Sequence, residues 1–142
     1  MTFLELPDNL AEQPLTGDKL IADVLDLLVS ERDRRRGCLL FALCDSAGRL
    51  VQPCMIDDLP DNLPASEFEA VVEVFVNLLA DNDPPGSLLV ARGRATGLSA
   101  TDQDITCGVT VEQACQGRVK LLGMHIITTE GSRPIPRSTA AA

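Results

Sequence analysis

Aromatic side chains are scarce in this chain of 142 residues, which has four phenylalanines and neither tryptophan nor tyrosine. Proteins that bind single-stranded nucleic acid stack its bases on such rings. The chain also has 12 basic and 21 acidic side chains, so its net charge is −9. This charge repels a phosphate backbone. We therefore expect no nucleic-acid partner.

Long hydrophobic runs are also missing. No segment reaches about 18 consecutive apolar residues. The first residues, MTFLELPDNLAEQPL, have neither a basic start nor a long apolar stretch. We therefore expect that the chain has no signal peptide and no membrane partner. The five cysteines are odd in number, lie mostly in apolar runs and include no C-x-x-C pair. They are typical of reduced thiols in a cytoplasmic protein.

The composition is that of one globular domain, with 45% hydrophobic and 23% charged residues. We expect a proline-interrupted arm over residues 1–15, a single α/β domain over 16–136 and a flexible tail of small residues over 137–142. The chain has no P-loop and no G-x-G-x-x-G motif, and we expect no cofactor.

The first half of the chain predicts a helix followed by a hairpin. Apolar residues at helical spacing favour a helix over 16–35, capped by Thr16 and ending in a solvated, arginine-rich turn. Two apolar runs around a Ser-Ala-Gly turn predict a β-hairpin over 37–57. Pro53 indicates an edge position or a bulge in the second strand, because proline donates no ladder hydrogen bond.

The second half alternates helices and strands. An S-x-x-E box at Ser66 predicts a helix to about residue 82, and SLLVARGR predicts a buried strand. Ser99-x-x-Asp102 indicates a further helix, which Gly123 would end before one or two last strands. This order predicts a three-layer α/β/α domain with a mixed sheet covered by helices.

Several stretches together resemble the JAB/MPN (JAMM) metalloprotease-like domain, and within it the bacterial RadC-type branch. They are the hairpin RGCLLFALCDSAGRLV, the helix from Ser66, the segment LLVARGRATGLSATDQDI and LLGMHIIT, in an order and spacing that agree over residues 36–136. The resemblance implies a three-layer fold of the cytidine-deaminase-like type, and a homodimer as one arrangement.

In that family two histidines and an aspartate bind zinc, and an upstream glutamate activates the bound water. The matching positions here are Arg92 and Arg94 for the histidines and Gly37 for the glutamate, while Ser99 and Asp102 are retained. A guanidinium group has no lone pair to offer a metal. The resemblance therefore implies a non-catalytic, metal-free domain that acts through contacts with a protein partner the sequence does not identify.

The two arginines also suggest an alternative function. Arg92 and Arg94 project to one side of a strand, next to Gly97 and the helix start at Ser99. Guanidinium groups at a helix N-terminus form a pocket for a phosphate or carboxylate. The competing interpretation pairs both arginines with the chain's own acidic side chains.

A second alternative is a hydrolase with a displaced metal set, such as Asp102, His125 and a cysteine. His125 is the only histidine and lies in an apolar strand, where a satisfied core residue is the commoner role. A nucleophilic pair would need Cys107 or Cys115 next to His125.

Overall fold

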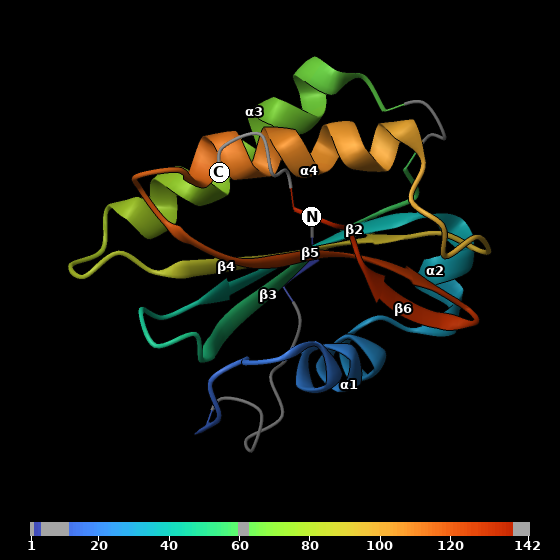
Figure 1. Ribbon diagram of the computed structural model, residues 1–142, viewed down its shortest axis with the longest axis horizontal. Coiled ribbons are helices and arrows are strands. Elements are labelled where there is room, and N and C mark those ends of the chain that lie inside the picture. Colours follow the sequence, from blue (N-terminus) through green and yellow to red (C-terminus); the bar gives the residue numbers. More distant parts are fainter. Residues whose placement is uncertain (1, 4–11, 60–62, 138–142) are drawn as a thin grey trace.

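A computed structural model describes residues 2–3, 12–59 and 63–137. Its centre is a six-stranded mixed sheet in the order β1-β3-β2-β4-β5-β6. Helices α3 (Ala65–Ala80) and α4 (Asp102–Cys115) lie on one face, and α1 (Asp18–Leu28) lies on the other (Figure 1). The predicted arrangement of helices on both faces of a mixed sheet is confirmed. The strands are β1 (Thr2–Phe3), β2 (Cys38–Cys44), β3 (Leu50–Asp57), β4 (Ser87–Gly93), β5 (Lys120–Thr128) and β6 (Gly131–Pro134).

Strand pairing confirms the predicted hairpin. Strands β2 and β3 are antiparallel, with a register shift between Leu43 and Cys44. That irregularity lies one residue from the pair Ala42–Pro53, and among the described residues only the two-residue β1 pairs with the outer edge of β3. Both features suit a proline in a strand. Strand β4 is central, antiparallel to β2 and parallel to β5.

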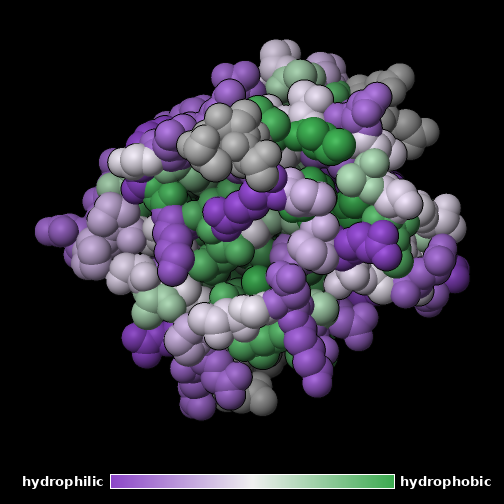
Figure 2. Space-filling view, in the orientation of Figure 1, coloured by the Kyte–Doolittle hydropathy of each residue, from purple (hydrophilic) through white to green (hydrophobic). Residues whose placement is uncertain are grey.

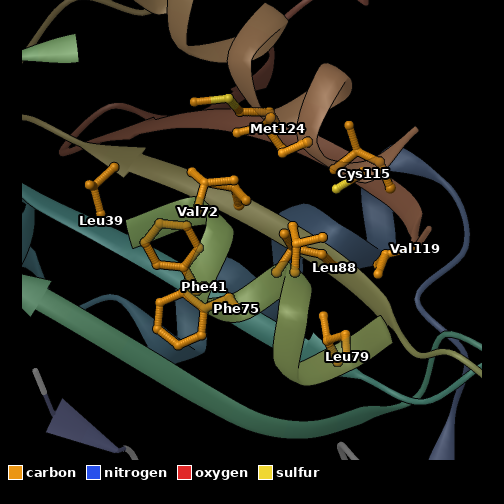
Figure 3. Packing of buried hydrophobic residues seen from close by; sticks show 14 of the residues in the cluster. Leu39, Phe41, Val72, Phe75, Leu79, Leu88, Cys115, Val119 and Met124 are labelled. Carbon is orange, nitrogen blue, oxygen red and sulfur yellow. The ribbon is translucent and has the colours of Figure 1, made fainter. Parts of the chain in front are cut away.

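Two hydrophobic cores lie on the two faces of the sheet because strand side chains alternate between faces. Beneath α3 and α4, Phe41 and Phe75 stack with their ring centroids 4.6 Å apart (Figure 3). Beneath α1, Leu25 packs with Leu40 and Leu89 of the sheet. The strand predicted as buried, SLLVARGR, thus contributes side chains to both cores.

The helix predicted over residues 16–35 is in fact two helices. Helix α1 begins after Gly17 rather than at Thr16, and α2 (Glu31–Arg36) begins after Ser30, whose Oγ accepts a hydrogen bond from the Asp33 amide. A serine at this position offers a new helix start, so the chain turns between the two helices. The α2 end is not wholly solvated either. Arg34 is buried and donates to the carbonyls of Val29 and Thr128 and to Asp26.

Three further predicted boundaries are wrong. Helix α3 begins at Ala65 after Pro64 and has no side-chain cap, so Ser66 does not form the predicted box. Helix α4 begins after Thr101 and ends at Cys115 rather than near residue 122. Gly123 lies within β5, where a Cβ atom would come within 3.1 Å of His125 Nε2. The missing side chain therefore makes room for the histidine ring.

The predicted terminal segments are described only in part. Within the arm predicted over 1–15, Thr2–Phe3 pairs with β3, whereas residues 1 and 4–11 lie outside the described part. The same is true of the tail predicted over 137–142, except for Arg137. No helix in the described ranges is long and apolar enough to cross a membrane.

Candidate functional site

A pocket of about 600 Å³ lies at the C-terminal end of β4. We call it the β4–α4 pocket. Its walls come from the start of β2, from Leu59 and Leu63, from the first turn of α3, from the end of β4, and from the loop and first turns of α4. All four residues predicted as an anion site line it, namely Arg92, Arg94, Gly97 and Ser99. The fold thus brings these residues to one cavity.

The two arginines share one carboxylate that was not predicted, that of Asp104. Arg94 Nη1 lies 2.7 Å from both Asp104 carboxylate oxygens, and Arg92 Nη1 lies 3.1 Å from Asp104 Oδ1. The Asp104 side chain is 0% exposed, against 19% for Arg92 and 26% for Arg94. The competing interpretation, in which the arginines pair with the chain's own acid, therefore describes this contact.

Asp104 reaches this position because it completes the N-terminal cap of α4. Thr101 Oγ1 accepts from the Asp104 amide at 3.1 Å, and Asp104 Oδ2 accepts from the Thr101 amide at 2.8 Å. This capping box aims the carboxylate back towards β4. Asp102, the predicted motif aspartate, is the exposed first residue of α4.

A signal in the sequence pointed to Asp104. The family segment ends in S-x-x-D-I, and here isoleucine follows Asp104 rather than Asp102. Thr101-x-x-Asp104-Ile105 matches that pattern with threonine in place of serine. Ser99 takes part through its backbone carbonyl, which accepts from Arg94 Nη2.

The cluster carries one excess positive charge. Burial acts to raise the pKa of Asp104, but hydrogen bonds from Thr101 and Arg94 and the charges of Arg94 and Arg92 outweigh it, so its pKa lies below 3.8. The carboxylate is therefore ionised at neutral pH. Two guanidinium groups against one carboxylate leave a single positive charge at the pocket wall.

The two arginines differ in how many donors they have left. Arg94 uses Nη1 on Asp104, Nε on the Gly97 carbonyl and Nη2 on the Ser99 carbonyl. Arg92 uses only Nη1, which contacts Asp104 Oδ1 and donates to Cys107 Sγ at 3.5 Å. Within residues 2–3, 12–59 and 63–137, no acceptor contacts Arg92 Nε or Nη2. The Nε and Nη2 donors of Arg92 are therefore available to a ligand.

Two neighbouring residues bear on catalysis. Burial raises the pKa of the Cys107 thiol, and Arg92 lowers it by less, so the thiol stays protonated and weakly nucleophilic at neutral pH. Gly37, which the sequence resemblance predicted to replace a glutamate, lines the pocket with a φ of 85°. A residue with a side chain is strained in that left-handed region.

His125 lies on the other face of the sheet. It alternates along β5 with Ile126, which packs beneath α3 and α4, and shares the face of Ile127, which packs beneath α1. Cys107 and Cys115 belong to α4, as does Asp102. The sheet therefore separates His125 from both proposed cysteine partners and from Asp102. Across the described ranges, no three His, Cys, Asp or Glu side chains are grouped to hold a metal ion.

Neither a protein-family model nor a curated protein matches this chain.

Proposed function

We propose that this chain is a non-catalytic domain that binds a small organic anion in the β4–α4 pocket. The observation that carries the proposal is the free Nε–Nη2 edge of Arg92 within a cavity of about 600 Å³. Sites for small molecules commonly have volumes of about 300–1,000 Å³ and a few placed polar groups. A guanidinium edge with two parallel N–H groups suits the two oxygens of a carboxylate or phosphate.

The surrounding charges support binding of an anion. Asp104 holds Arg92 through Nη1, and a donor already oriented by one partner loses less side-chain entropy when a ligand binds. Arg94 donates to both carboxylate oxygens of Asp104, so its charge already neutralises that carboxylate without Arg92. The excess positive charge is therefore available to a ligand.

The residues present argue against hydrolysis. Arg92 and Arg94 offer no lone pair to a metal, and Gly37 supplies no carboxylate. The Cys107 thiol is protonated, and His125 is across the sheet. In the described pocket wall, no nucleophilic side chain is paired with a general base.

We also propose that the domain is of the JAB/MPN type, with guanidinium groups in the place of the family's zinc ion. The support is positional. The family's two histidines and aspartate share one cation, and here the matching Arg92 and Arg94 converge on Asp104. The two guanidinium groups thus supply, beside the aspartate, the positive charge that the zinc ion supplies in the family.

Thermal unfolding in different anions tests the binding proposal. Phosphate, acetate and longer carboxylates are compared with chloride at constant ionic strength, on the natural chain, Arg92→Met and the matched control Arg35→Met. A ligand at about 100 times its Kd adds about 2.7 kcal/mol. For a chain of this size that raises the midpoint by roughly 5–10 °C. We expect the rise in the natural chain and in Arg35→Met, whose guanidinium is exposed and outside the pocket, and its loss in Arg92→Met.

An equal rise in Arg92→Met, or none with any anion, contradicts the proposal. Arg94 still pairs with Asp104 in that variant, so the buried carboxylate keeps a partner.

The hypothesis of a protein-interaction module, with a homodimer as one form, stays a prediction. The face drawn in Figure 2 is rimmed by hydrophilic side chains, with hydrophobic ones towards its middle. The large apolar residues exposed in the described part are spread over four elements: Leu27 on α1, Val51 on β3, Val74 and Leu78 on α3 and Ile105 on α4. This distribution favours no particular partner.

A further inference from the structure

We infer that the ligand of the β4–α4 pocket is an organic monocarboxylate with an apolar body. This inference rests on the proposed function and adds the chemical class of the anion. It follows from three properties of the pocket, namely the net charge of the Arg92–Arg94–Asp104 cluster, the free donors of Arg92 and the division of the described walls into a polar and an apolar part.

The head group is set by charge and by donors. Arg92, Arg94 and Asp104 together leave one positive charge, which a carboxylate neutralises with its single negative charge. The free Arg92 edge presents Nε and Nη2, which match two coplanar oxygens. Arg94 has committed all three nitrogens to Asp104 and to backbone carbonyls.

A phosphate monoester fits these groups less well. It carries a charge of about −1.5 to −2 at neutral pH and three acceptor oxygens. One free guanidinium edge serves two of those oxygens, and one excess charge leaves part of the negative charge uncompensated. The net charge of −9 on the whole chain adds repulsion that grows with the charge of the ligand.

The body of the ligand is set by one wall of the pocket, which described residues at the start of β2, on either side of residues 60–62 and in α3 contribute. Its side chains are aliphatic or aromatic: Leu39, Leu59, Leu63 and Phe68. Leu39 and Phe68 are buried core residues and hold this wall in place, whereas Leu59 and Leu63 are only half-buried. Polar side chains such as Thr96, Thr106 and Gln103 lie on the loop and α4 side. A ligand with its carboxylate at Arg92 would place an apolar body along the leucines.

Calorimetric titration of a homologous series tests this assignment. The ligands are acetate, butanoate, hexanoate and octanoate, with 1-hexanol and octyl phosphate as matched probes of the head group. Each buried methylene is expected to tighten binding about fourfold until the wall is covered. Hexanoate should bind roughly 10- to 100-fold more tightly than 1-hexanol, because the alcohol has no charged head for Arg92. Octyl phosphate should bind more weakly than octanoate.

Variants separate the two parts of the pocket. Arg92→Met should remove the preference for the acid while leaving the affinity for 1-hexanol, and Arg92→Lys should recover only part of it because lysine lacks the two-pronged edge. Leu63→Ser should flatten the dependence on chain length, and it replaces only a half-buried side chain. Arg35→Met is the control and should bind as the natural chain does.

The outcomes distinguish this inference from the proposed function. If acetate and phosphate bind at Arg92 and longer chains gain nothing, the inference is overturned and the anion site stands. Tighter binding of octyl phosphate than of octanoate also overturns the inference alone. If no acid binds, or if Arg92→Met binds acids as well as the natural chain, both are overturned.

Discussion

The buried polar side chains of this fold differ in how well they are paired with partners. Arg34 and Asp104 are buried charged residues, and each is held by partners distant in the chain: Thr128 for Arg34, and Arg92 and Arg94 for Asp104. A buried charge is tolerated only when it is paired and hydrogen-bonded. His125 differs, because it is 2% exposed and its Nδ1 has no hydrogen-bond partner among the described residues.

His125 should make the stability of the protein depend on pH. Burial lowers its pKa below 6.5, with Asp18 of α1 opposing the shift. Above about 6.5 the histidine is neutral in both states and contributes no pH dependence. Below that pH the unfolded chain takes up a proton that the folded chain does not, so stability falls as pH falls. We expect the free energy of unfolding, measured by urea titration, to drop from pH 7.5 to 5.5 by up to about 1.4 kcal/mol per pH unit.

The control for this prediction is His125→Gln. The chain has one histidine, and carboxylates titrate mainly near pH 4. The variant should therefore lose most of the dependence between pH 7.5 and 5.5. An unchanged slope in His125→Gln would assign the effect to other groups.

Helices α2 and α4 have side-chain caps, whereas α1 and α3 begin without one. Thr101 caps α4 through its Oγ1, whereas Ser66 lies inside α3, which has no side-chain cap. Thr101→Ala should lower the free energy of unfolding by about 1 kcal/mol. Ser66→Ala should change it by less than about 0.5 kcal/mol, as for other exposed sites. Urea unfolding of the two variants measures both values, and equal losses would contradict the assignment of the caps.

The whole molecule combines a mixed sheet with a cluster at the end of β4, and this arrangement makes the proposed JAB/MPN type testable. In Arg92→His/Arg94→His, two imidazoles and Asp104 would supply three zinc ligands and leave an open position, as in catalytic zinc sites. We expect about one Zn²⁺ per chain by metal analysis after dialysis, and none in the natural chain.

Two aspartate variants in the double-histidine background identify the third ligand. Adding Asp104→Asn should abolish zinc binding, while adding Asp102→Asn should leave it, because Asp102 is exposed at the start of α4. Circular dichroism checks that each variant is folded. Two results would contradict the proposed positional match: zinc lost on adding Asp102→Asn but kept on adding Asp104→Asn, or no zinc in the double-histidine variant itself.

The alternation of helices and strands, the β2–β3 hairpin, the buried central strand and the helices on both faces of the sheet were all predictable from the amino-acid sequence. These follow from hydrophobic periodicity, which is local and strong in segments such as CLLFALC and SLLVARG. The sequence also placed Arg92 and Arg94 on one side of a strand, since that depends only on their spacing.

Three features depend on contacts between distant segments: which carboxylate pairs with the two arginines, where α2 separates from α1, and which face of the sheet His125 occupies. Asp102 and Asp104 are both acceptable near a helix start, and the choice between them depends on the cap at Thr101 and on the packing of α4 against β4. The sequence predicted helix starts at Ser66 and Ser99, but α3 begins at Ala65 after Pro64 and α4 begins after Thr101. Local patterns set which side chains share a face, whereas contacts between distant segments set what those side chains touch.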